Sequence, residues 1–145
     1  MDIFPAIIGL IGLVAATAGL GAYLRRRPQR VRRDVSHEVV DPRRLGADAL
    51  GESATLLQFS TEMCARCPGV HRMLAQTAAA HPGVLHLDVD LTHRPDIARH
   101  FHVLQTPTTL VLDRDGVIRT RLGGVPGREV LDLELTRLTG ATTRA

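Results

Sequence analysis

Apolar and polar residues along the chain form one long apolar segment near the N-terminus, followed by several short apolar runs separated by polar turns. Residues 54–59 are mostly apolar over a length typical of a buried strand. Residues 68–80 repeat apolar side chains at helical spacing, and residues 84–90 have the composition of another strand. This order of elements predicts an α/β domain.

The other runs extend the same pattern. Asp115-Gly116 is a hairpin signal between two apolar runs, and Gly123-Gly124 ends the second of them. A domain of roughly 105 residues is large enough for a single α/β core. The further elements that we predict are a strand over 35–40, a helix over 42–50, a short helix over 94–101, a strand arm over 117–122 and an amphipathic helix over 126–138.

The segment from Ile3 to Leu24 contains no charged residue. A helix of this length measures about 33 Å, which matches the hydrocarbon core of a bilayer and predicts a transmembrane helix. A cleaved signal peptide is the alternative, and Ala16-Thr17-Ala18 has the small residues of a cleavage site. Met1-Asp2 has no basic residue, however, and the apolar run exceeds a typical signal sequence. We therefore predict that residues 1–24 are an uncleaved, single-pass anchor.

Arginines follow this segment directly, whereas Asp2 is the only charged side chain before it. Such an asymmetry places the arginine side in the cytoplasm, so the C-terminal domain is predicted to be cytoplasmic at the cell membrane. Without these six positive charges the net charge of +3 becomes −3. The basic run lacks interleaved aromatic residues, so we predict contact with anionic lipid and no nucleic-acid binding. The arginines, within a juxtamembrane linker over 25–34, are Arg25, Arg26, Arg27, Arg30, Arg32 and Arg33.

Cys64 and Cys67 are the only cysteines of the chain, and they lie between a predicted strand and a predicted helix. A pair at this spacing is typical of a dithiol that cycles to a disulfide. The helix N-terminus favours a thiolate at Cys64. Arg66 adds a positive charge, worth about 1–3 kcal/mol at roughly 6 Å, which would lower the pKa of the Cys64 thiol by about a unit. Cys64 is thus the predicted nucleophile and Cys67 the resolving thiol.

The segment around Cys64 resembles the active site of the thioredoxin family, in which a strand, Trp-Cys-Gly-Pro-Cys or a variant, and a long helix follow one another. Met63 stands at the tryptophan position, and Ala65-Arg66 replace Gly-Pro. Residues 105–116 resemble the family's cis-proline element. The resemblance implies a thioredoxin-like fold over residues 35–145, with a central mixed sheet flanked by helices. It also implies a cis bond between Thr106 and Pro107, whose backbone would bind the substrate.

Two positions depart from the family pattern. Gln58 stands where the family has a buried acid that accepts the proton of the resolving thiol. Because an amide cannot take up that proton, Cys67 is expected to lose it to water or to a group of the substrate. His86 stands at the position of a buried lysine and is either a substitute base or a plain surface or packing residue; we favour the second interpretation.

The predicted function is that of a membrane-tethered thiol-disulfide oxidoreductase. Cys64 would attack the disulfide of a protein or of a small thiol, and Cys67 would resolve the mixed disulfide, with no cofactor beyond the cysteine pair. Small residues four apart between 12 and 22 would allow two anchors to pack, and the oligomeric state stays open.

Two alternatives remain. A binding module with little turnover is suggested by Gln58, by Met63 and by an aromatic content of only 3%. A metal or thiol carrier for membrane proteins is suggested by the ligand spacing of Cys64, Cys67 and His71. We expect no metal site, because His71 most simply faces solvent and the implied cis proline would cover the cysteine pair.

Overall fold

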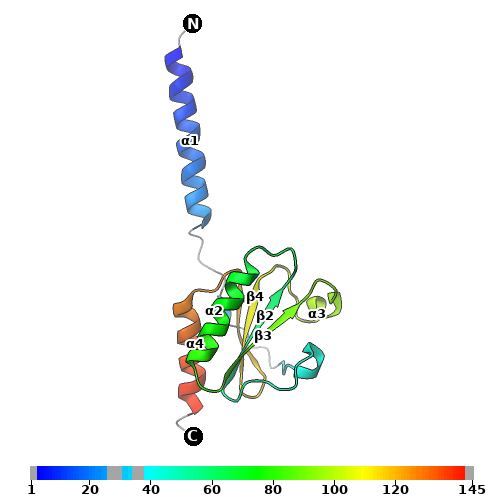
Figure 1. Cartoon of the computed structure of the whole chain (residues 1–145). Coiled ribbons are helices and arrows are strands. Elements are labelled where there is room, and N and C mark those ends of the chain that lie inside the picture. The colour runs from blue at the N-terminus through cyan, green and yellow to red at the C-terminus, as the bar shows by residue number, and fades with distance from the viewer. Residues whose placement is uncertain (1–2, 26–30, 34–37, 143–145) are drawn as a thin grey trace.

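The chain forms a mixed sheet with helices on both faces, preceded by a separate N-terminal helix (Figure 1). This computed structural model describes residues 3–25, 31–33 and 38–142. The five strands lie in the order β1-β5-β4-β2-β3, with β2 and β3 parallel and every other neighbouring pair antiparallel. The strands are β1 (Val31–Arg33), β2 (Ala54–Ser60), β3 (Val84–Asp90), β4 (Thr108–Asp113) and β5 (Ile118–Gly123). The helices are α1 (Ile3–Arg25), the 3-10 helix η1 (Pro42–Leu45), α2 (Cys67–Ala80), α3 (Pro95–His100) and α4 (Arg128–Thr142).

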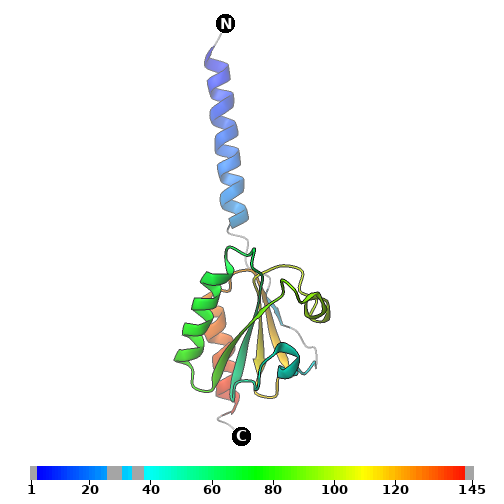
Figure 2. The same cartoon turned by 45° about the vertical axis from the view of Figure 1, so that its right-hand side comes forward.

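Two apolar clusters hold the helices against the sheet. On one face, α2 and α4 cover the sheet, and Leu56 packs with Leu74 and Leu131 (Figure 2). On the opposite face, α3 and η1 pack over Phe59, whose ring lies 5.3 Å from that of Phe101. Successive residues of a strand point to opposite faces, so β2, buried on both faces, contributes to both clusters. The predicted α/β fold is confirmed.

The strands over 54–59 and 84–90, the arm over 117–122 and the long helix after the cysteines all agree with the predictions, within one or two residues at each end. The helix predicted over 42–50 is wrong in length, because it is a single 3-10 turn. The carboxylate of Asp41 accepts a hydrogen bond from the Arg43 backbone N–H, and Gly46 ends the turn in the left-handed conformation at φ 76°. The helix predicted over 126–138 begins later, at Arg128, and extends to Thr142.

The first strand differs from the prediction. Residues 34–37 of the strand expected over 35–40 lie outside the described residues, and its described part contributes only a single bridge from Val39 to Val117. The edge strand β1 is formed instead by residues within the segment that we predicted to be a linker. It pairs with β5, whose outer N–H and C=O groups would otherwise lack a sheet partner.

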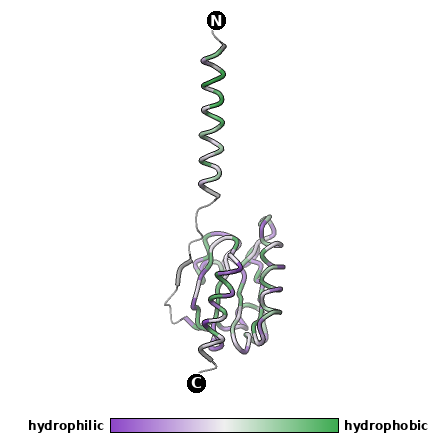
Figure 3. The backbone as a smooth tube through the Cα atoms, turned by 90° about the vertical axis from the view of Figure 1, so that its left-hand side faces the viewer, coloured by the Kyte–Doolittle hydropathy of each residue, from purple (hydrophilic) through white to green (hydrophobic). Residues whose placement is uncertain are grey.

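Helix α1 lies apart from the sheet, and much of it has hydrophobic colouring in Figure 3. Apolar side chains along it are exposed, among them Phe4, Ile8 and Leu13. Among the residues that the structure describes, no helix is both long enough and apolar enough to be assigned as a membrane span. The transmembrane helix expected over residues 3–24 therefore stays a prediction of the sequence.

Candidate functional site

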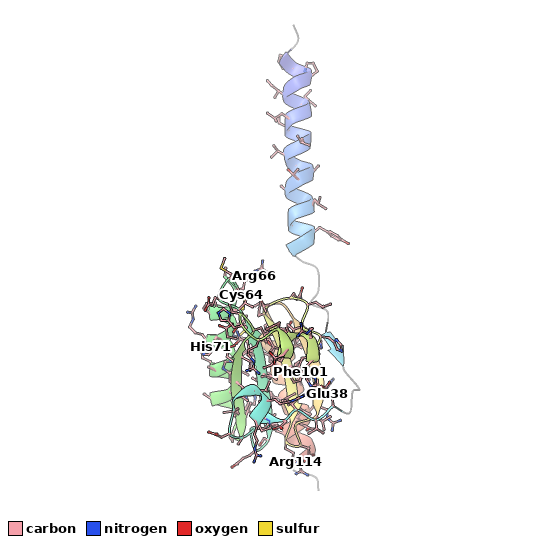
Figure 4. All side chains as sticks on the ribbon, turned by 90° about the vertical axis from the view of Figure 1, so that its right-hand side faces the viewer. Glu38, Cys64, Arg66, His71, Phe101 and Arg114 are labelled. Atoms are coloured by element: carbon pink, nitrogen blue, oxygen red, sulfur yellow. A yellow bond between two sulfur atoms is a disulfide. The ribbon has the colours of Figure 1, made fainter. Side chains whose placement is uncertain are left out.

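The two cysteines lie in the turn that connects β2 to α2, and a disulfide joins them (Figure 4). The backbone N–H of Cys64 donates to the Thr61 carbonyl, and the N–H of Cys67 donates to the Cys64 carbonyl, both at 3.1 Å. Cys67 is the first residue of α2 and is buried, with 4% of its surface exposed, whereas Cys64 is half-buried. A partner molecule therefore reaches the sulfur of Cys64 first.

The start of α2 agrees with the electrostatics expected for Cys64. Arg66 is the N-cap residue, and its side chain makes no capping hydrogen bond. Pro68 follows within the first turn and has no backbone N–H. The positive end of the helix dipole is therefore directed toward the turn that holds Cys64. The side chain of the cap residue does not offset it with a hydrogen-bond acceptor. In Figure 4 the labelled Arg66 lies next to Cys64 at the end of the domain.

The second predicted motif lies beside the first. The Thr106–Pro107 peptide bond is cis, which confirms the prediction, and β4 begins at the next residue. The hydroxyl groups of Thr61 and Thr106 are 3.1 Å apart and join the loop of the cysteines to the loop of the proline. Pro107 is buried and Thr106 half-buried. The two motifs, some forty residues apart in sequence, thus form one site.

Gln58 is fully buried beneath this turn. Its Nε2 donates to the carbonyl oxygen of Cys67 at 3.2 Å, and its Oε1 accepts from Nε2 of His86, also at 3.2 Å. The amide thus binds the backbone of Cys67 on one side and an imidazole on the other. The position predicted for the missing acid is therefore close to the resolving cysteine.

His86 is a half-buried residue of β3, and it does more than pack, because it bonds Gln58. Burial lowers the pKa of His86 below its ordinary value of 6.5, since a charged imidazole would lose hydration. The neighbouring His71 lowers this pKa further, and Asp88 acts in the opposite direction. His86 is accordingly held as a neutral hydrogen-bond donor to the amide.

His71 lies on α2 and is only half exposed, so the expectation that it simply faces solvent is incomplete. Its Nδ1 is 2.9 Å from Oδ2 of Asp88, and its ring contacts the ring of His86 edge-on, with centroids 4.7 Å apart. The other carboxylate oxygen of Asp88 accepts a hydrogen bond from Ser60 Oγ at 2.6 Å. Among the described residues, no three His, Cys, Asp or Glu side chains are grouped in a way that would hold a metal ion.

Sequence reasoning missed Asp88 and Ser60. A signal was present in the alternation of β3, where positions 86, 88 and 90 are all polar and share one face. Gln58 is paired with Asp88 and Ser60 with Asp90 in the parallel register of β2 and β3. A polar stripe on the face of β3 that α2 covers indicates a functional end of the sheet.

A surface pocket of about 430 Å³ connects these groups. Cys64 and Cys67 form part of its wall, and His71 and Asp88 form another part. Its lining includes Thr61, Glu62, Cys64, Cys67, His71 and Asp88.

A mixed sheet that places a cysteine pair at the start of a helix, next to a cis proline, defines a class of thiol-disulfide exchange proteins. No protein-family model matches the chain. The thioredoxin of Mycolicibacterium smegmatis is 34% identical over 93 residues, which cover 61% of this chain and 82% of that protein. The chain belongs to the thioredoxin family, and it is a thiol-disulfide oxidoreductase.

Solved structures agree with the fold. A thioredoxin from Fasciola hepatica superposes with a TM-score of 0.53 at 22% identity, covering 61% of this chain and 83% of that one. A thioredoxin from Nicotiana alata gives a TM-score of 0.53 at 21% identity and covers 60% and 74% of the two chains. At these identities the likeness establishes the fold alone.

Proposed function

We propose that Cys64 attacks substrate disulfides and that Cys67 resolves the resulting mixed disulfide. The difference in exposure between the two sulfurs carries this proposal, because only Cys64 is accessible in the turn while Cys67 is 4% exposed. The uncapped start of α2 and the charge of Arg66 both favour a thiolate at Cys64.

In the reduced protein, the Cys64 thiolate attacks one sulfur of the substrate, and the other substrate sulfur leaves with the electron pair. Cys67 then attacks Cys64, the bond between Cys64 and the substrate breaks, and the protein is left with the Cys64–Cys67 disulfide. The substrate gains two electrons from the cysteine pair. It takes one proton from Cys67, and the other, which Cys64 gave up on forming its thiolate, comes from solvent. No further cofactor enters this reaction.

Protein disulfides are the substrates that the surface favours. Met63 is 93% exposed directly before the nucleophile, and Leu104 is 95% exposed in the loop that leads to the cis proline. Large apolar side chains with this exposure on two adjacent loops suit the apolar centre of a protein interface. The substrate chain would lie between these two loops and pair with the backbone at Thr106 and Pro107.

We further propose that α1 tethers the domain to the cell membrane as a single pass, with the domain on the cytoplasmic side. Support comes from the uncharged stretch between Ile3 and Leu24, from its exposed apolar side chains and from the arginines that follow it. A reporter that works only in the cytoplasm should be active when it is fused after Ala145, and a reporter that works only outside the cytoplasm should be inactive there. The full chain should resist alkaline extraction from membranes. A reporter active outside the cytoplasm would overturn the orientation.

Trapping tests the chemistry. Cys67→Ser should accumulate a mixed disulfide with substrate that reductant releases, because the second step is blocked. Cys64→Ser is the matched control and should trap nothing. If Cys67→Ser also traps nothing, from membranes or from added oxidised glutathione, the protein instead behaves as a binding module with little turnover.

A further inference from the structure

His71 lies one helical turn beyond the resolving cysteine. Residues four apart in a helix have Cβ atoms about 5–6 Å from each other on the same face. His71 also lines the pocket that contains Cys64 and Cys67, and Figure 4 shows it just below Cys64 on the same side of the domain. This position puts the imidazole on the same face of α2 as Cys67 and in the wall of the pocket that contains both cysteines.

Asp88 determines which nitrogen of His71 is basic. An ionised carboxylate only accepts hydrogen bonds, so the 2.9 Å contact with Asp88 requires a proton on Nδ1 of His71. Nε2 is then the nitrogen that carries the free lone pair. Ser60 donates to the second carboxylate oxygen and fixes the orientation of Asp88. The arrangement is that of a base held in one tautomer by a half-buried carboxylate.

The second histidine cannot serve equally well. Nε2 of His86 is occupied as donor to Gln58, and the ring is half-buried between the sheet and α2. Two protonated imidazoles with centroids 4.7 Å apart would repel each other, so the pair takes up one proton more easily than two. The ring of His71 is the more exposed of the two and lies beside the Asp88 carboxylate.

The charged groups around His71 come from each neighbouring element. β3 supplies Asp88 and the neutral His86, and Asp90 lies farther along the same strand in the pocket wall. The loop before α2 contributes Glu62, and α2 itself contributes Arg72. Among the groups that line the pocket with His71, the carboxylates outnumber the arginine.

We propose that His71, positioned by Asp88, transfers the proton of the resolving step. As the Cys67 sulfur bonds to Cys64, its proton passes to Nε2 of His71. The bond between Cys64 and the substrate breaks, the electron pair leaves on the substrate sulfur, and this sulfur takes the proton from Nε2. The imidazole ends neutral, as it began. This inference rests on the proposed roles of the two cysteines, and it gives the site a base although Gln58 cannot be one.

Release of glutathione from a preformed mixed disulfide at Cys64 tests this step. His71→Gln should slow the release at pH 7 by about 100-fold, the lower end of the range for a positioned acid-base group. It should also change the shape of the pH–rate profile, because a proton-transferring group is removed. Asp88→Asn should slow release less. His81→Gln, at the far end of α2, is the matched control and should keep the wild-type rate and profile.

The outcomes separate the two proposals. A wild-type rate and pH profile in His71→Gln would overturn the role of His71 and leave the cysteine roles intact. If Cys64 forms no mixed disulfide even in Cys67→Ser, the cysteine roles fail and the inference about His71 fails with them. Slower release with an altered pH profile in His71→Gln, and neither change in His81→Gln, supports both.

Discussion

The two faces of the sheet differ most at the end that carries the cysteines. On the face covered by α3, the apolar cluster continues close to the C-terminal end of β2. Its members there are Phe59, Phe101 and Ile97. On the face covered by α2, the cluster of Leu56, Leu74 and their neighbours stops, and polar residues take over before the strand ends. The same two strands therefore present a dry core on one side and a hydrogen-bonded polar group on the other.

The polar end is costly unless every member is bonded, because buried polar atoms lose their hydration. The amide of Gln58 uses both its donor and its acceptor, and Asp88 uses both its oxygens. The only buried side-chain polar atom left without a partner among the described residues is Oγ1 of Thr109, which lies opposite Gln58 where β4 pairs with β2. The concentration of hydrogen-bonded polar side chains beside the cysteines indicates that this face serves their chemistry, while the opposite face serves stability.

Truncation on the dry face should give the largest effect. Phe59→Ala removes a fully buried ring from both its cluster and its contact with Phe101, and should lower the free energy of unfolding by about 3–5 kcal/mol. Urea denaturation measures this loss. Glutathione release per folded molecule should stay near the wild-type value. A large fall in that rate would show that the dry face also shapes the site.

On the polar face, a carboxylate introduced at position 58 should restore a base next to Cys67. In the His71→Gln background, Gln58→Asp should recover at least about tenfold of the lost rate at pH 7, because a carboxylate then lies next to the resolving thiol. Stability should fall, since a buried charge is introduced with only His86 as a donor. Gln58→Asn in the same background is the control, because asparagine has the length of aspartate and is not basic. It should recover nothing in the single-turnover assay.

Reactivity of the exposed thiol should change by a smaller factor. Arg66→Gln removes an exposed positive charge next to Cys64 and should slow its alkylation at pH 7 by a few-fold, roughly the effect of 1 kcal/mol. The expected order of labelling, Cys64 before Cys67, should persist because the helix N-terminus is unchanged. Iodoacetamide labelling of the reduced protein followed by mass spectrometry measures both. Equal labelling of the two thiols would contradict the assignment of the nucleophile.

Local patterns predicted the parts of the fold that local physics decides. The apolar run of β2, the helical spacing of α2 and the proline before β4 are all visible in short windows of sequence, and the structure agrees with them. The edge strand β1 was not predictable in this way, because arginines give no apolar alternation and the strand is defined by its pairing with β5. The bond between His71 and Asp88 joins residues 17 apart on different elements, so it depends on how α2 packs over β3.

The pH dependence of stability between pH 7.5 and pH 5 should show the smallest effect, and we expect it to arise from His86 on the polar face. Burial lowers the pKa of His86 below the value of 6.5 that it has in an unfolded chain. Between these two values the unfolded chain binds more protons than the folded one, so the stabilisation is complete above pH 6.5 and is lost as the pH falls through the folded pKa. His86→Gln keeps a donor for Gln58 and should make the difference in unfolding free energy between pH 7.5 and pH 5 smaller than in the wild type. Urea titrations at the two pH values measure the difference, with His81→Gln as the control that should match the wild type. An unchanged difference in His86→Gln would mean that the polar face titrates through other groups.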